Sequence, residues 1–201
     1  GEVILEQDLS SVSRKRAKIL TKTLKSPIEE FGKRLLAVSK QLLNAQDNTL
    51  PPYLAFGDAQ CMALENASVD LIVTSPPYAS NAIDYMRAHK FSLVWMGYPI
   101  RDLGDKRKGY IGGEAVSQFS FKAMPDRTAS VVKKVADVDE KKGLVLHRYY
   151  SEMTLVLREM FRILKPGKAA IVVVGSSTMR GLDTETEKCL AEIGESLGFH
   201  V

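Results

Sequence analysis

The first clear pattern along the chain is an amphipathic helix. Between residues 26 and 43, apolar side chains recur at steps of three and four, at Ile28, Phe31, Leu35, Val38 and Leu42. Ser26, Pro27 and Glu29 have the order of a capped helix start, with a hydroxyl cap, proline in the first turn and a carboxylate three residues after the cap. We predict a helix over residues 26–43 with one apolar face, preceded by a shorter helix.

Further along, two uninterrupted apolar runs predict strands. One covers Val69 to Thr74 and stops at Pro76 and Pro77, and the other covers Ala169 to Val174. Apolar runs without polar alternation are typical of parallel strands that are buried on both faces. A short strand over residues 54–56 and one or two helical turns over residues 59–64 are also predicted.

Helical patterns separate these strands. The first has its apolar stripe at Tyr150, Met153, Leu157, Met160, Phe161 and Leu164, and ends in the turn residues Lys165, Pro166 and Gly167. A second helix starts at Thr184 with Glu187, is apolar at Leu190, Ile193 and Leu197, and ends at Gly198 before a strand from Phe199. Alternating strands and helices predict an α/β sandwich with a mainly parallel sheet.

Residues 97–147 show no sustained periodicity and contain several glycines and charges. A long segment without regular structure is usually functional or mobile, so we predict an insert there. Residues 101–142 would form a target-recognition element or lid that is mobile without nucleic acid. The expected organisation is an N-terminal helical extension over 1–50 and a main domain over 51–201.

Composition narrows the class of protein. A chain of 201 residues with 45% hydrophobic side chains can bury one substantial core. No apolar run is long enough to span a bilayer and no secretory signal is recognisable, which favours a cytoplasmic protein. Cys61 and Cys189 lack partners at metal-ligand spacing, so we expect neither a disulfide nor a metal site. The net charge of +4 permits contact with a phosphate backbone but does not establish it.

The most specific chemistry follows the first long strand. Ser75, Pro76, Pro77 and Tyr78 end it abruptly. The run Asp-Leu-Ile-Val-Thr-Ser-Pro-Pro-Tyr over residues 70–78 resembles the catalytic motif of the amino-methyltransferase family. A strand-ending turn is the alternative interpretation, because serine, proline and tyrosine are ordinary residues next to turns.

That resemblance implies a Rossmann-like methyltransferase sandwich, incomplete here, that methylates DNA with S-adenosylmethionine. The Ser75 hydroxyl and the Pro76 carbonyl would accept hydrogen bonds from an exocyclic base amine, Pro77 would add rigidity, and Tyr78 would stack on the flipped base. In this family serine at the first motif position points to the N4 amine of cytosine. Adenine N6 in DNA, guanine N2 in RNA, and a non-catalytic nucleic-acid-binding module are the alternatives.

The resemblance also assigns binding roles. Cofactor contacts fall on Asp58, Ala59 and Thr74, although an aspartate before a helical turn is also a common cap. Nucleic-acid contacts fall on Asp84, Tyr85 and Arg87. Lys106 and Arg107 are added because they belong to a basic cluster that could face phosphate, whereas Phe91, Leu93 and Trp95 are expected in the core. The family's F-x-G-x-G cofactor loop is absent from these residues. We therefore expect a fragment whose parent protein carries that loop elsewhere.

Overall fold

A computed structural model describes residues 25–44, 52–79, 82–104, 109–113, 116, 119–175 and 177–201. The chain divides into two compact units, residues 1–54 and 55–201. Each unit is considered by itself. No helix in the described ranges is both long and apolar enough to cross a membrane.

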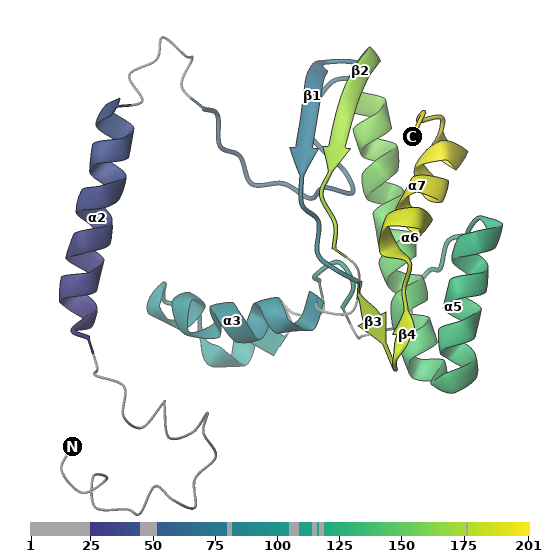
Figure 1. The fold of residues 1–201 in the computed structure, drawn as a ribbon, viewed down its shortest axis with the longest axis horizontal. Coiled ribbons are helices and arrows are strands. Elements are labelled where there is room, and N and C mark those ends of the chain that lie inside the picture. The colour runs from purple at the N-terminus through teal and green to yellow at the C-terminus, as the bar shows by residue number, and fades with distance from the viewer. Residues whose placement is uncertain are drawn as a thin grey trace, which may run out of the picture. The chain divides into compact units, whose positions relative to one another are not determined.

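The described part of the first unit is dominated by helix α2, Pro27–Asn44 (Figure 1). Its predicted start is confirmed, because the Ser26 Oγ accepts a hydrogen bond from the Glu29 N–H at 3.4 Å. The apolar stripe is exposed, and Ile28 retains 83% of its surface. The shorter helix that we predicted before α2 lies outside the described residues.

The second unit mixes helices with short strands. Its strands are β1 (Val69–Thr74), β2 (Leu164–Val172), β3 (Thr178–Met179) and β4 (Leu182–Asp183). Its α-helices are α3 (Ala82–Trp95), α5 (Asp126–Val138), α6 (Glu140–Ile163) and α7 (Thr186–Leu197), with a short 3₁₀ helix, η2, at Ile100–Asp102. Figure 1 shows β1 and β2 pointing in the same direction, toward the small β3–β4 hairpin.

The predicted parallel pairing is confirmed between β1 and β2. Ile72 lies opposite Ala170 and Thr74 opposite Val172. The turn that we predicted at residues 165–167 is instead an irregularity within β2, because the pairing register shifts between Val69 and Leu71. Gly167 makes this possible with a φ of +73°, a backbone conformation that glycine adopts without a Cβ penalty.

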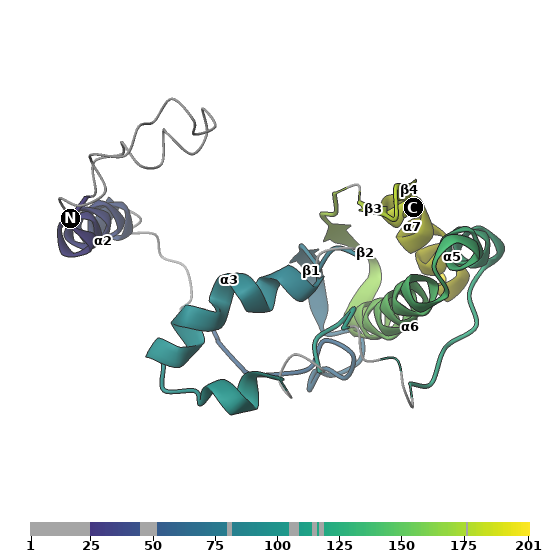
Figure 2. The same ribbon diagram turned by 90° about the horizontal axis from the view of Figure 1, so that it is seen from below.

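Only one face of the β1–β2 sheet is covered by described residues. Helices α5, α6 and α7 gather on one side of it (Figure 2), and Ile72, Val172 and Val174 pack toward that core. On the opposite face Val73 keeps 64% and Ile171 50% of its surface. The prediction of strands buried on both faces is therefore wrong here, since no described element of the unit packs on that second face.

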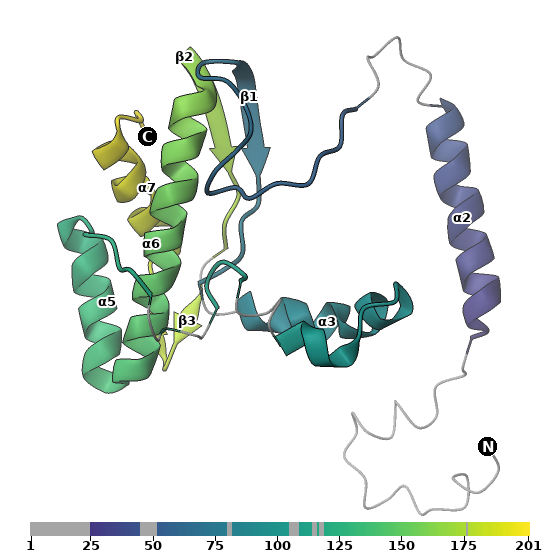
Figure 3. The same cartoon turned by 180° about the vertical axis from the view of Figure 1, so that it is seen from behind.

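Helix α6 is the centre of the core, as Figure 3 shows from behind, where it lies between β2 and the helices α5 and α7. Leu146, Tyr149, Tyr150 and Met153 are almost completely inaccessible to solvent. Gly143 allows α5 to approach closely, because a Cβ at this position would lie 2.6 Å from the Ala136 Cα. Packing of α5 and α7 against α6 buries much of the apolar surface of this core, and burial of apolar surface is the main favourable term in folding.

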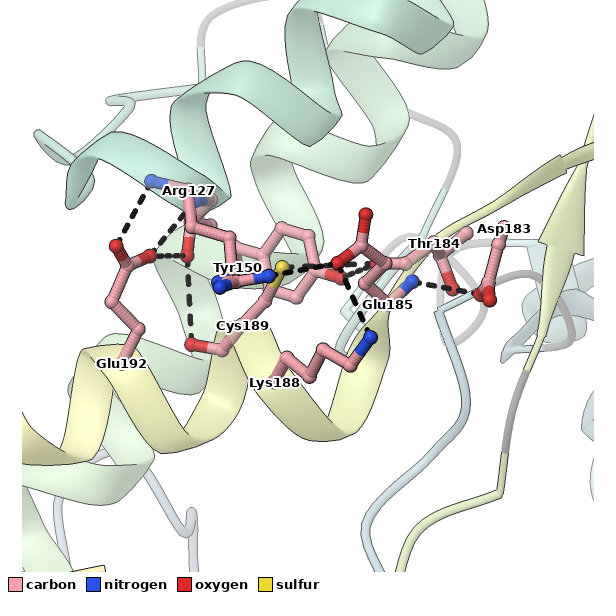
Figure 4. Close-up of polar contacts among 9 residues, drawn as sticks. Arg127, Tyr150, Asp183, Thr184, Glu185, Lys188, Cys189 and Glu192 are labelled. Carbon is pink, nitrogen blue, oxygen red and sulfur yellow. Dashed lines mark hydrogen bonds and ion pairs between the residues drawn. The ribbon is translucent and has the colours of Figure 1, made fainter.

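A buried polar network joins α5, α6 and α7 (Figure 4). The Tyr150 hydroxyl donates to the Thr184 carbonyl at 2.6 Å, and the Glu192 carboxylate accepts from the Arg127 and Thr128 N–H groups at the start of α5. Burial raises the pKa of the Cys189 thiol, which keeps this cysteine protonated and unreactive. The network satisfies buried polar groups and orients the three helices, which is a structural role.

Several local predictions are wrong. Residues 54–56 are not a strand, residues 59–64 contain turns rather than a helix, and no strand begins at Phe199. Phe91 and Trp95 keep 78% and 91% of their surface, so they are not in the core of the described structure. For Phe91 and Trp95 the prediction assumed a burial partner that the described residues do not supply.

The prediction that residues 97–147 lack regular structure also needs correction. Its second half forms α5 and the start of α6, with Val131, Val132 and Val135 buried between them. Before α5, the Ser151 Oγ on α6 accepts a hydrogen bond from the Lys122 N–H at 3.0 Å. Packing against α6 orders residues whose sequence pattern alone was weak.

Candidate functional site

The Ser-Pro-Pro-Tyr motif lies where β1 ends. The Thr74 carbonyl still accepts from the Val173 N–H at 2.8 Å, so strand pairing continues up to the residue before the motif. The Ser75 side chain is then exposed, Pro76 is buried, and Pro77 and Tyr78 are half-buried. The motif is therefore held at its base by the sheet while its serine faces solvent.

Tyr78 lies beside the end of the neighbouring strand. A Cβ added at Gly175 would lie 3.5 Å from Cζ and 3.7 Å from the hydroxyl oxygen of Tyr78. These are ordinary van der Waals distances, so the ring edge lies on the side of Gly175 where a side chain would stand. Tyr78 therefore lies next to Gly175, three residues beyond the end of β2.

A hydrogen bond from the core fixes the second proline. The Tyr149 hydroxyl on α6 donates to the Pro77 carbonyl at 2.9 Å, across a sequence separation of 72 residues. Tyr149 itself has no exposed surface. Because proline lacks an N–H, a carbonyl is the only backbone group through which Pro77 can be held in this way.

A pocket of about 390 Å³ lies next to the motif. Its walls come from three separate segments, and the residues are Gly57, Asp58, Ala59, Gln60, Pro77, Gly109, Tyr110 and Ile111. The structure thus brings together three residues predicted from different roles: Asp58 and Ala59 from the cofactor set and Pro77 from the catalytic set. Thr74, the third predicted cofactor residue, does not line this pocket.

Asp58 presents a carboxylate at this pocket. One of its oxygens, Oδ1, accepts from the Gln60 N–H at 2.9 Å in a local turn, and its backbone forms a bridge with Cys61. The alternative interpretation of Asp58 as a helix cap is replaced by this turn, since no helix follows. Its second oxygen, Oδ2, is a suitable acceptor for an amino group.

The pocket wall at residues 110–112 is attached to a buried ion pair on α6. The Glu152 carboxylate accepts from the Gly112 N–H at 2.5 Å and from the Arg148 Nε at 2.9 Å. The Arg148 guanidinium also reaches the Tyr110 carbonyl at 3.4 Å. Burial raises the pKa of Glu152, although the Gly112 and Arg148 hydrogen bonds oppose that shift.

A second ion pair holds the segment that carries Asp58. Arg162, near the end of α6, donates to Glu159 at 2.7 Å and to the Met62 carbonyl at 2.9 Å. Glu159 in turn accepts from the Met62 N–H at 2.9 Å. The Arg162 hydrogen bond, followed by the Met62 N–H, lowers the pKa of Glu159 to about 2. Both walls of the pocket are therefore attached to α6.

Other predicted residues are not placed at this pocket. The side chains of Asp84, Tyr85 and Arg87 lie outside the described part of α3, and Lys106 and Arg107 fall outside the described ranges altogether. A larger cavity of about 970 Å³, between β2, α6 and α7, is mostly apolar and contains none of the motif residues. The smaller pocket is the better candidate, because polar groups converge there.

The sequence interpretation missed Tyr149, Arg148 and Glu152. A signal existed in their spacing, because Arg148 and Glu152 are four residues apart and fall within the apolar stripe region of the helix, where charges are rarely buried without a partner. Nothing in the sequence indicated that their partners would be Pro77 and the residues around Gly112.

Together these features define a mixed α/β protein with a small parallel sheet and a pocket at the carboxyl end of β1, which is the usual place for ligands in this class. The chain is 25% identical over 209 aligned positions to the Type II methyltransferase M.AvaI of Nostoc sp. (strain PCC 7120 / SAG 25.82 / UTEX 2576), covering 88% of the chain and 43% of that protein.

Two further relatives have the same designation. The Type II methyltransferase M.MvaI of Kocuria varians is 21% identical over 80% of the chain and 36% of its own length. The Type II methyltransferase M.BsoBI of Geobacillus stearothermophilus is 21% identical over 88% of the chain and 39% of its own length. No family model and no solved structure matches. The chain thus spans about two fifths of the length of these curated relatives.

Proposed function

We propose that this chain is the target-base-binding part of an S-adenosylmethionine-dependent DNA methyltransferase that methylates the N4 amine of cytosine. The observation that carries the proposal is the Ser-Pro-Pro-Tyr turn at the end of β1, with an exposed Ser75 and with Pro77 on the same pocket as Asp58. The designations of the relatives favour the same reaction class.

The motif suits a weakly nucleophilic amine. The lone pair of an exocyclic base nitrogen is delocalised into the ring, so the enzyme must direct its N–H groups toward acceptors that favour a pyramidal nitrogen. The Ser75 hydroxyl and the Pro76 carbonyl supply two such acceptors, and Tyr78 supplies a flat face for the extruded base. The amine nitrogen would bond the methyl carbon as the bond between that carbon and the cofactor's sulfur breaks, so that a neutral thioether leaves, and the methylated amine would release one proton to solvent.

We assign one end of the cofactor to this pocket. Bound S-adenosylmethionine would supply a methyl group carried on positively charged sulfur. Asp58 is suited to hold an adenine amino group, because its Oδ1 accepts a hydrogen bond from the Gln60 N–H while its Oδ2 can accept one from the amino group. Ala59 lies beside it on the pocket wall, and its small side chain leaves room for the base. We assign the remaining cofactor contacts to parts of the parent protein outside this chain, including the glycine-rich loop.

The cytosine assignment rests on the serine at motif position 75. Duplex DNA with a flipped base is the proposed partner, and Asp84, Tyr85, Arg87, Lys106 and Arg107 are the proposed contacts to it. The enzyme would work in the cytoplasm and, like its Type II relatives, would belong to a restriction-modification system.

A methyl-transfer assay on the full-length protein tests this function. The protein is incubated with DNA and S-adenosylmethionine labelled in its methyl group, and the product nucleoside is identified by mass spectrometry. N4-methylcytosine is the expected product. N6-methyladenine, or a methylated guanine in RNA, would overturn the base assignment, and a protein that binds DNA but transfers no methyl group would instead be a non-catalytic module.

Matched serine variants test the site. Ser75→Ala removes one acceptor from the reacting amine, and the loss of one such group typically lowers the rate about 10²-fold. Ser68→Ala is the control, because Ser68 directly precedes β1, at the end away from the motif, and its hydroxyl donates to the Glu65 carbonyl. Equal activity of the two variants would contradict the role of Ser75.

A further inference from the structure

Tyr149 makes a contact that its place in the core does not require. It is fully buried on α6, and its hydroxyl donates to the Pro77 carbonyl at 2.9 Å. Its ring also meets the ring of Tyr150 edge to face, with centroids 5.2 Å apart. The side chain is therefore fixed by packing while its hydroxyl reaches the motif.

We infer that Tyr149 is a positioning residue for the reaction, acting through Pro77. This inference rests on the proposed methyltransferase function. With the Pro77 carbonyl already bonded to Tyr149, the neighbouring Pro76 carbonyl is the proline acceptor assigned to the base amine. The bond thus occupies one acceptor site of the Pro77 carbonyl and favours the Pro76 carbonyl as the acceptor for the substrate.

The rigidity of the motif makes such a bond effective. Proline φ angles are fixed near −65°, so the direction of the Pro76 carbonyl depends mainly on the orientation of the peptide group that joins Pro76 to Pro77. A hydrogen bond to the Pro77 carbonyl restrains that orientation. Tyr78 follows Pro77 directly in the chain, and its ring lies next to Gly175. The hydrogen bond to the Pro77 carbonyl therefore also limits how far the Tyr78 ring can move.

A neighbouring tyrosine provides a matched control. Tyr150 is equally buried, and its hydroxyl donates to the Thr184 carbonyl at 2.6 Å, within the structural network of α5, α6 and α7. Tyr149→Phe and Tyr150→Phe each remove one buried hydroxyl that is bonded to a backbone carbonyl. The two variants differ in whether that carbonyl belongs to the motif.

The experiment measures single-turnover methyl transfer to DNA by the full-length protein and by both variants. Partial unfolding lowers the amplitude of a single turnover, whereas misplacement of the reacting groups lowers its rate constant. We expect Tyr149→Phe to lower the rate constant about 10- to 100-fold, the range produced by small misplacements of reacting groups. Tyr150→Phe should leave the rate constant within about twofold of the unmodified protein while its amplitude or melting temperature falls.

The outcomes separate the two proposals. An unmodified protein without any methyl transfer overturns the proposed function itself. An active protein in which Tyr149→Phe and Tyr150→Phe have the same rate constant overturns the positioning role of Tyr149 and leaves the function standing. A slow rate constant in Tyr149→Phe alone, with S-adenosylmethionine affinity unchanged by calorimetry, supports both.

Discussion

Replacing Glu152 by alanine tests how the pocket wall is held. The Arg148 and Glu152 side chains keep only 7% and 6% of their surface, so the change leaves a buried guanidinium without its carboxylate. Breaking such a pair typically costs about 3–5 kcal/mol. Arg148 keeps the Tyr110 carbonyl and the Phe119 ring, 5.2 Å from its guanidinium carbon, which offsets part of that cost. The Gly112 N–H also loses its acceptor. We expect a loss of about 3 kcal/mol in the free energy of unfolding.

A helical pair of identical spacing provides the control. Lys133 and Asp137 on α5 are also four residues apart, at 2.8 Å, but their side chains keep 75% and 62% of their surface. An exposed pair of this kind contributes about 0.3–0.5 kcal/mol. Asp137→Ala should therefore cost little, which isolates the effect of burial from the effect of helix spacing.

Urea denaturation followed by circular dichroism measures the free energy of unfolding of both variants, and a thermal melt gives their melting temperatures. For a protein of this size, a change of 1 kcal/mol shifts the melting temperature by roughly 2–4 °C, so Glu152→Ala should melt about 6–12 °C below the unmodified protein. Glu152→Gln keeps an acceptor for the Gly112 N–H, so its free energy of unfolding should lie between those of Glu152→Ala and Asp137→Ala. The reasoning about the buried pair is refuted by a Glu152→Ala variant that lies within about 1 kcal/mol of Asp137→Ala.

Two further predictions concern other contacts of α6. The Glu159 pKa is lowered from 4.5 to about 2, so this carboxylate stabilises the fold above pH 4.5 and the contribution disappears as the pH falls to about 2. Glu159→Gln should therefore show a smaller loss of unfolding free energy over that pH interval than the unmodified protein, and parallel pH profiles would contradict the ion pair with Arg162. Gly143→Ala should destabilise the protein by about 1–3 kcal/mol, since the new methyl group overlaps Ala136 on α5, whereas Gly32→Ala on α2 meets no atom within 4 Å and should not lower the melting temperature. Equal melting temperatures for the two glycine variants would show that α5 can move away at no cost.

Local patterns predicted the regular elements well where the pattern was internally complete. The steps of three and four from Ile28 to Leu42 correspond to α2, and the apolar runs before Pro76 and after Gly167 correspond to β1 and β2. Predictions failed where they assumed a partner. Leu71 and Val73 belong to an apolar run that is typical of a strand covered on both faces, yet both side chains are exposed. Their burial depends on whether another element packs on that face of the sheet, which the sequence of the strand itself does not specify.

The candidate site shows the same division. The Ser-Pro-Pro-Tyr turn, its place after a strand, and Asp58 as a carboxylate near a strand-like segment were all recognisable from residue order. Tyr149 and Glu152 were not, because their roles depend on hydrogen bonds to Pro77 and Gly112, which are 72 and 40 residues away along the chain.

The amino-acid sequence by itself determined the type and approximate position of α2, β1, β2, α6 and α7, because turn residues and hydrophobic periodicity act over a few neighbouring residues. It also determined the chemistry available at the motif. Only the tertiary structure decided which face of the sheet is covered and which proline carbonyl is held by the core. It also brought Asp58, Pro77 and Tyr110 to one pocket. These outcomes depend on distances between segments that are remote in the chain, and such distances follow from packing around α6.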